Sequence, residues 1–139
     1  MNESFVIDNS IVMAWCFRDE VNPYADAVLN SLTEAVALVP SIWPLEVVNV
    51  LLVAERRQRL HQTDSVRFLA LLAQLPIVVE QSRPEERMGE LLALGRAGNL
   101  SSYDAAYLEL AMRRGVPIAT LDQKLIEAAN SVAAPLLEI

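Results

Sequence analysis

Short apolar runs alternate with longer segments whose apolar residues recur at helical spacing along most of the 139-residue chain. The short runs, which predict β-strands, span residues 4–8, 37–40, 76–80, 116–120 and 135–139. The longer segments predict helices over residues 9–17, 22–35, 41–60, 63–75, 83–98, 101–115 and 121–130. Strands that alternate with helices are typical of a parallel sheet covered on both faces. We therefore expect an α/β fold, a three-layer α/β/α sandwich with a mainly parallel central sheet, in a single domain over residues 1–139.

Residues that favour helix ends mark several of these boundaries. Pro44 stands in the first turn of the third predicted helix, and Thr63 and Ser101 are expected to cap the fourth and sixth helices. Gly98 and Gly115 stand where the fifth and sixth helices are expected to end.

The composition narrows the kinds of partner and site. Eighteen Asp and Glu residues stand against eleven Lys and Arg, and the net charge of −7 argues against binding of duplex nucleic acid through a broad basic face. Cys16 is the only cysteine and His61 the only histidine, which excludes an internal disulfide and a Cys/His zinc site. No apolar run approaches the ~20 residues of a membrane span, so we expect a cytoplasmic protein without membrane contact.

Four acidic residues stand in one kind of position, near the end of a predicted strand or the start of a predicted helix. They are Asp8, Glu46, Asp104 and Asp122. In an open parallel sheet such positions gather at the carboxyl ends of the strands, where ligands bind. Each acid could instead serve only as a helix cap, because Ser101 and Asp104 form a possible capping box and Asp122 precedes the last helix.

Two of these acids fit a capping role poorly. Glu46 and Asn49 are the only polar residues between Trp43 and Ala54, and their spacing places them on one helix face. Asp104 is likewise surrounded by apolar residues. Two carboxylates ~4 Å apart repel by roughly 4 kcal/mol, whereas a helix N-terminus stabilises a nearby carboxylate by only ~0.3–1 kcal/mol. A divalent cation that prefers oxygen ligands, Mg²⁺ or Mn²⁺, would relieve this repulsion.

Four segments together resemble the PIN-domain family. They are DNSIVMAW from Asp8, PLEVVNVLL from Pro44, SSYDAAYLELA from Ser101 and IATLDQKL from Ile118. Their order and spacing are most similar to the single-domain bacterial and archaeal members, the VapC-type toxins of type II toxin–antitoxin pairs. The resemblance covers essentially the whole chain and implies a PIN-like fold.

The resemblance also implies an activity, that of a metal-dependent endoribonuclease. In such a hydrolase Mg²⁺ or Mn²⁺ activates water for attack on an RNA phosphodiester. Asp8 and Asp104 match the direct metal ligands, and Glu46 and Asp122 match ligands that act through water or orient the attacking water. Gln123 adds no further acid beside Asp122, so we expect one bound ion.

Three polar residues are expected to support these acids. Ser10 and Ser101 match the small hydroxyl positions of the family, and Asn49 is placed behind the ligands, where it would orient them.

Partner expectations come from the same resemblance and from the apolar content of 53%. Apolar surface left over after core packing favours protein contacts, here a homodimer and a cognate antitoxin. Arginines at two predicted helix ends either complement the helix dipoles or contact an RNA backbone. They are Arg56, Arg57, Arg59, Arg113 and Arg114.

Two other functions remain open at this level. One is a non-catalytic PIN-like module that binds metal and RNA. The other is a phospho-acceptor receiver domain, which would need a second acid beside Asp8 and a lysine after a late strand. Ile7 and Asn9 flank Asp8, and Lys124 falls inside the last predicted helix, so this second alternative is the weaker.

Overall fold

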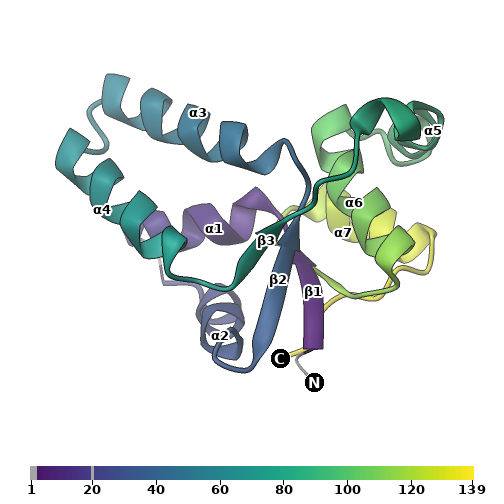
Figure 1. Ribbon diagram of the computed structural model, residues 1–139, viewed down its shortest axis with the longest axis horizontal. Coiled ribbons are helices and arrows are strands. Elements are labelled where there is room, and N and C mark those ends of the chain that lie inside the picture. Colours follow the sequence, from purple (N-terminus) through teal and green to yellow (C-terminus); the bar gives the residue numbers. More distant parts are fainter. Residues whose placement is uncertain (1–2, 20) are drawn as a thin grey trace.

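The computed structural model describes residues 3–19 and 21–139, in which a central parallel sheet lies between two groups of helices (Figure 1). The strands are β1 (Glu3–Ile7), β2 (Ala35–Val39), β3 (Ile77–Val79) and β4 (Ile118–Ala119). The α-helices are α1 (Asn9–Cys16), α2 (Pro23–Ser31), α3 (Trp43–Arg56), α4 (Gln62–Ala73), α5 (Met88–Gly98), α6 (Ser102–Arg114) and α7 (Gln123–Ser131). A 3₁₀ turn, η1 (Pro84–Arg87), leads into α5.

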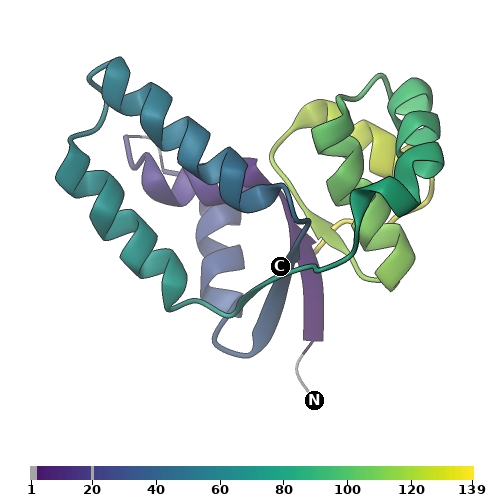
Figure 2. The same ribbon diagram turned by 45° about the horizontal axis from the view of Figure 1, so that its top comes forward.

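The strand order is β3-β2-β1-β4, and every pairing is parallel. Helices α1 to α4 lie on one side of the sheet and α5, α6 and α7 on the other (Figures 1 and 2). This arrangement confirms the expected α/β class and the three layers. Parallel strands covered on both faces are buried, which explains why Phe5, Val6 and Ile7 of β1 are all apolar and enclosed.

The pairing of β1 with β4 determines what meets at the carboxyl end of the sheet. Val6 is opposite Ile118 and Ile7 is opposite Ala119, and the Asp8 amide donates to the Ala119 carbonyl at 3.2 Å. The next residue on each strand is polar, Asp8 on β1 and Thr120 on β4. The register therefore places these two side chains together, although they stand 112 positions apart in the chain.

The fourth helix begins earlier than the sequence indicates. Helix α4 begins at Gln62 with His61 as its N-cap, so the expected cap at Thr63 is wrong. The Asp64 carboxylate accepts a hydrogen bond from the His61 amide at 2.9 Å and satisfies one of the free N–H groups near this helix start.

Two other boundaries also differ. The helix predicted over residues 83–98 is a 3₁₀ turn followed by α5, and Asn99 rather than Gly98 takes the left-handed conformation that ends it, with φ of 51°. The last predicted strand, 135–139, is reduced to one parallel bridge between Leu136 and Ile118. Pro135 lacks an amide hydrogen and cannot donate in a longer ladder.

Candidate active site

Asp8 lies at the carboxyl end of β1 and is only 3% exposed. Its Oδ1 accepts hydrogen bonds from the Ser10 hydroxyl at 2.5 Å and from the Ile11 amide at 3.4 Å, and its Oδ2 accepts from the Thr120 hydroxyl at 2.6 Å. Burial raises the pKa of this carboxyl to about 6, although the three hydrogen bonds act in the opposite direction. Asp8 is therefore fixed in place but costly to ionise.

Ser10 and Thr120 also shape the loop that follows β4. The Leu121 amide donates to Ser10 Oγ at 2.9 Å, and the Asp122 amide donates to Thr120 Oγ1 at 3.0 Å. Asp122 in turn caps α7, because its Oδ1 accepts from the Leu125 amide at 3.0 Å. The capping interpretation of Asp122 is thus confirmed, and the same network leads from Asp122 back to Asp8.

Asp104 stands in the first turn of α6, directly after the cap formed by Ser101. The Ser101 hydroxyl accepts from the Asp104 amide at 3.1 Å, as the sequence predicted. Burial raises the pKa of the Asp104 carboxyl, and the charge of Asp122 raises it further, while Lys124 acts to lower it. Asp104 is thus close enough to Asp122 for the two charges to repel.

Glu46 reaches the same region from the first turn of α3. The Tyr107 hydroxyl donates to Glu46 Oε1 at 2.6 Å across 61 positions of sequence. Burial raises the pKa of Glu46, and the charge of Asp104 adds to this shift. Tyr107 is 1% exposed, and burial together with the Glu46 carboxylate raises the pKa of its hydroxyl, which keeps it a donor.

These couplings show which of the four acids the structure brings together. Asp104 is the shared neighbour, since its charge acts on Asp8 and on Glu46 and it is itself acted on by Asp122. Asp8, Glu46 and Asp122 therefore each lie within electrostatic reach of Asp104. Lys124 lies near enough to Asp104 to act on it as a positive charge.

A hollow of about 320 Å³ opens beside Glu46. Asn9 and Asn49 line it together with Glu46, so Asn49 lies near the acids as expected. The Oδ1 atom of Asn9 is buried and has no hydrogen-bond partner in the part of the chain that the structure describes.

The side chains present fit a hard divalent cation by their chemistry. The donors are carboxylate and hydroxyl oxygens, and burial raises the pKa of the Asp8, Glu46 and Asp104 carboxyls, so a cation would favour their ionised forms. Within residues 3–19 and 21–139, no three Asp, Glu, His or Cys side chains converge closely enough to enclose an ion by themselves. Mg²⁺ usually keeps several waters and needs only one or two carboxylates, so this arrangement is compatible with it.

Two residues of this region were not predicted as site residues from the sequence. Thr120 ends the predicted strand 116–120, and Tyr107 falls within the segment SSYDAAYLELA, and neither position by itself predicts a site role. The spacing of Asp104 and Tyr107, three positions apart on α6, could have indicated that they share a helix face. The partners they contact, Asp8 and Glu46, are fixed only by the tertiary fold.

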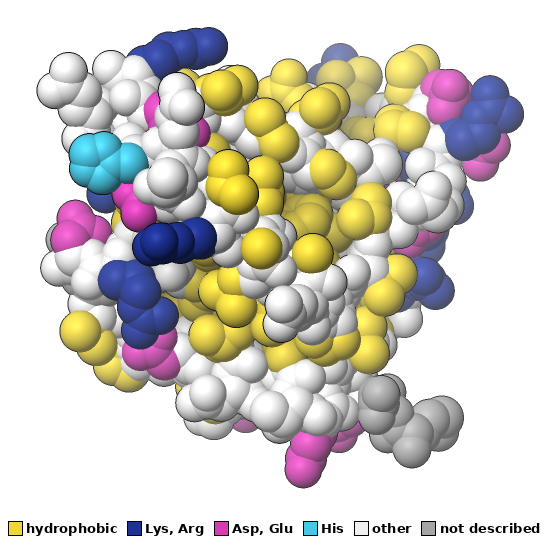
Figure 3. All heavy atoms as spheres, turned by 60° about the vertical axis from the view of Figure 1, so that its left-hand side comes forward, with side chains coloured by type: hydrophobic (Ala, Val, Ile, Leu, Met, Phe, Trp, Pro, Cys, Tyr) yellow, Lys and Arg dark blue, Asp and Glu magenta, His cyan; other side chains and the backbone are white. Residues whose placement is uncertain are grey.

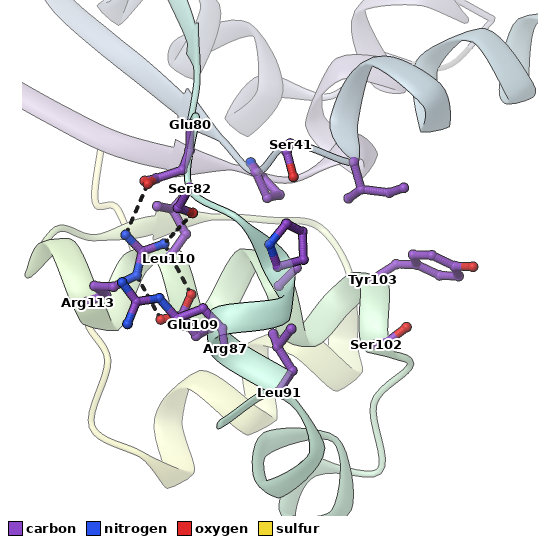
Figure 4. A pocket seen from close by; sticks show the side chains of 14 residues that line it. Ser41, Glu80, Ser82, Arg87, Leu91, Ser102, Tyr103, Glu109, Leu110 and Arg113 are labelled. Carbon is purple, nitrogen blue, oxygen red and sulfur yellow. Dashed lines mark hydrogen bonds and ion pairs between the residues drawn. The ribbon is translucent and has the colours of Figure 1, made fainter. Parts of the chain in front are cut away.

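The arginines at helix ends have different environments. Arg113 forms ion pairs with Glu80 at 3.1 Å and with Glu109 at 2.9 Å, and its side chain is 22% exposed (Figure 4). Arg59 lies over the Phe17 ring, 4.1 Å from its centroid, and pairs with Asp19 at 3.5 Å. Both arginines thus have structural partners, so a nucleic-acid role is not needed to explain either of them.

An apolar surface covers much of the face formed by α3 and α4 (Figure 3). Its exposed large side chains include Leu45, Val48, Leu52, Val66 and Leu69. Trp43, Val47 and Leu72 continue the surface inward into a groove of about 300 Å³. Among the described residues, no helix combines the length and the apolarity that a membrane span requires.

The PIN domain family model matches residues 5–131, and the chain belongs to the PIN domain family. PIN domains are generally nucleases and commonly use divalent metal ions. A comparison of the sequence with curated proteins found no match.

Two solved structures are similar in fold. PAE2754 from Pyrobaculum aerophilum superposes with a TM-score of 0.68 and 21% identity, over 92% of this chain and 87% of that chain. FitAcB from Neisseria gonorrhoeae gives a TM-score of 0.63 and 16% identity, over 96% of each chain. At these identities the likeness concerns the fold alone.

Proposed function

We propose that the protein is a Mg²⁺- or Mn²⁺-dependent endoribonuclease and the toxin of a toxin–antitoxin pair, acting in the cytoplasm. The observation that carries the nuclease proposal is the mutual coupling of four carboxylates around Asp104, in a chain that belongs to a family of metal-dependent nucleases. Such a group of charges is unfavourable unless a cation joins it.

In this proposal Asp8 and Asp104 hold the ion, and Glu46 and Asp122 act through water or orient the attacking water. When bound, the ion would activate a water for in-line attack on a phosphodiester and stabilise the departing oxygen, which gives 5′-phosphate and 3′-hydroxyl products. Ser10 and Thr120 fix the Asp8 carboxyl by donating to its two oxygens, which is the support that a metal ligand requires.

The remaining polar residues hold the other acids in place. Tyr107 donates to Glu46 and determines the direction of that carboxylate. Ser101 caps α6 at the amide of Asp104 and so fixes the turn that carries this ligand. Asn49 and Asn9 line the hollow beside Glu46. Their amide NH₂ groups can donate to a phosphate oxygen or a water, and their amide oxygens can accept from a water.

Cleavage of RNA by the purified chain tests the nuclease proposal. We expect single-stranded RNA to be cut with Mg²⁺ or Mn²⁺ and not with EDTA, and we expect Asp104→Asn to lower the rate at least about 100-fold by removing a ligand. Asp26→Asn is the matched control, because Asp26 also stands in the first turn of a helix, α2, and lies outside the acidic site. Equal cleavage by Asp104→Asn and the wild type would show that the site is assigned wrongly.

The same titration separates the alternative functions. A metal that raises the melting temperature without cleavage of any RNA would favour a non-catalytic PIN-like module. The receiver-domain alternative no longer applies, because the chain belongs to the PIN family and Lys124 lies inside α7.

The apolar face of α3 and α4 supports the proposed protein partners, a second copy and a cognate antitoxin. Leu45 is 68% exposed and Val66 is 67% exposed, which is unusual for large apolar side chains that share one face. Light scattering tests the homodimer, and a monomeric mass at every concentration would contradict it. Loss of RNA cleavage on addition of a candidate antitoxin tests the second partner.

A further inference from the structure

A second cavity, of about 190 Å³, lies next to the acidic site (Figure 4). Its lining comes from the segments after β2 and β3, from the start of α5 and from α6. On α6 the lining residues Ser102, Ala106, Glu109 and Arg113 recur at helical spacing, and Asp104 points from a different face. The cavity is therefore separate from the acids although it shares a helix with them.

Most of the side chains that line the cavity are uncharged. Leu91, Leu110 and Pro84 supply apolar surface. The two acids in the wall, Glu80 and Glu109, are both paired with Arg113, which closes one end of the cavity (Figure 4). Arg87 is the other charged side chain of the wall, so two arginines stand against two acids, and the charges of the wall sum to about zero beside the acidic site of a chain with net charge −7.

Tyr103 connects the cavity with the active site. It stands at the end opposite Arg113 (Figure 4), precedes Asp104 in the chain and is 54% exposed. Tyr103 and Ile42 line both this cavity and the hollow that contains Glu46 and Asn9. The two spaces are therefore adjacent at these two side chains, and a bound molecule can occupy both.

We propose that this cavity receives one unpaired nucleobase of the RNA, next to the phosphodiester that is cut at the acids, and that Tyr103 stacks on it. The proposal rests on the proposed ribonuclease activity and adds to it a subsite for one base beside the bond that is cut. Proteins that read unpaired RNA stack bases on aromatic side chains and hydrogen-bond their edges. Here the hydroxyls of Ser41 and Ser102 line the cavity and can hydrogen-bond a base edge, whereas Ser82 is engaged by Arg113.

The size and charge of the cavity favour a base over other occupants. Its volume is below the ~300–1,000 Å³ of clefts that enclose whole drug-sized ligands, which suits a single ring system. The charges of the wall balance, with Glu80 and Glu109 against Arg87 and Arg113, which suits a neutral ring. An apolar wall with a few hydroxyls and an exposed tyrosine at the rim matches a neutral, flat, polar-edged ring.

Abasic substitution of the substrate tests this inference directly. The probe is a single-stranded RNA oligonucleotide that the wild type cuts at one mapped bond, together with versions that carry one abasic ribose at each flanking position. For the wild type, we expect loss of one particular base to lower kcat/KM by about 5- to 150-fold, the range for removal of one stacked base. Tyr103→Ala should lower kcat/KM on the intact RNA by a similar factor and should no longer respond to that abasic position.

Three further variants make the test specific. Tyr103→Phe keeps the ring and should behave as the wild type. Ala106→Leu narrows the cavity from its α6 wall with a good helix former and should lose the same response. Met112→Ala is the control, because Met112 is an exposed residue of the same helix outside this cavity.

The outcomes separate this inference from the proposed function. If the wild type cuts no RNA with Mg²⁺ or Mn²⁺, the proposed function fails and the base site fails with it. If the wild type cuts RNA but Tyr103→Ala and Ala106→Leu respond to abasic positions as the wild type does, the base site alone is overturned. The cavity would then serve another ligand, such as a segment of a partner protein.

Discussion

Asp8 has the lowest exposure of the four candidate acids, and its protonation couples the site to the stability of the fold. Its pKa is raised from 3.8 to about 6, mainly by burial. A carboxyl with a raised pKa in the folded state stabilises the fold below its unfolded pKa, and this contribution is lost as the pH rises through the folded pKa. The metal-free protein should therefore lose about 2 kcal/mol of stability through Asp8 between pH 4 and pH 7.

Replacement of Asp8 by asparagine isolates this effect. Asp8→Asn cannot ionise, and the hydroxyls of Ser10 and Thr120 can rotate to meet the new amide. In EDTA, the free energy of unfolding of the variant minus that of the wild type should increase by about 2 kcal/mol from pH 4 to pH 7. Urea unfolding at each pH measures it, with Asp26→Asn as control. A difference that does not change with pH would contradict the burial of an ionised Asp8.

The identities of the acids could be predicted at the residue scale, but their immediate partners could not. Asp8, Glu46, Asp104 and Asp122 stood out because strand ends and helix starts converge in a parallel sheet. Tyr107 and Thr120 did not stand out, because an apolar helix face and a strand end give tyrosine and threonine ordinary structural roles. Their hydrogen bonds to Glu46 and Asp8 span 61 and 112 positions, and only the tertiary fold, which brings Glu46 of α3 to Tyr107 of α6 and sets the register of β1 with β4, creates them.

At the scale of elements, Arg113 ties α6 to the end of β3. It pairs with Glu80 after β3 and with Glu109 one turn earlier on α6, and these side chains are 12% and 11% exposed. Although burial acts to raise it, the pKa of Glu80 is lowered by its hydrogen bonds with Arg113 and Ser82 and by the charges of Arg113 and Arg114. The pair therefore stabilises the fold above the ordinary pKa of Glu80, and this contribution is lost as the pH falls.

Removal of Arg113 should therefore destabilise the protein well beyond a surface substitution. Arg113→Ala leaves the largely buried carboxylate of Glu109 without a cation and that of Glu80 with only the longer contact of Arg114, and we expect the free energy of unfolding at pH 7 to fall by about 3 kcal/mol. Arg114→Ala is a matched control, because Arg114 makes one 3.4 Å contact with Glu80 and is 49% exposed, so its loss should cost less than about 1 kcal/mol. Equal effects of the two variants would contradict a special role for Arg113.

The existence and order of the elements could be predicted from periodicity, whereas several ends could not. The run over residues 135–139 is apolar enough for a strand, but Pro135 and the two-residue length of β4 leave one bridge. His61 replaces Thr63 as a cap because Asp64 reaches back to the His61 amide, an interaction that depends on the local backbone rather than on cap preference. Such local hydrogen bonds decide helix ends by small free energies that sequence patterns do not resolve.

At the scale of the whole molecule, the acidic site and the apolar face of α3 and α4 are two distinct surfaces. The net charge is −7, the acids of the candidate site face one end of the sheet, and an apolar face covers α3 and α4. Long-range attraction of RNA by a broad basic field is not expected from this balance. In the proposed function, RNA binding therefore depends on the ion held by the acids, on stacking of a base and on local contacts.

Divalent cations should therefore stabilise the whole fold through one site. A ligand that binds only the folded state raises the free energy of unfolding by RT ln(1 + [L]/Kd), which is about 2.7 kcal/mol at 100 times Kd. Part of this gain comes from relief of the repulsion centred on Asp104, so we expect Mg²⁺ or Mn²⁺ to raise the melting temperature of the wild type more than NaCl at the same ionic strength. Asp104→Asn should respond to the two salts alike, while Asp26→Asn should keep the wild-type response. An equal rise with NaCl in the wild type would mean that the cations only screen the net charge of −7, and that no specific ion joins the four carboxylates.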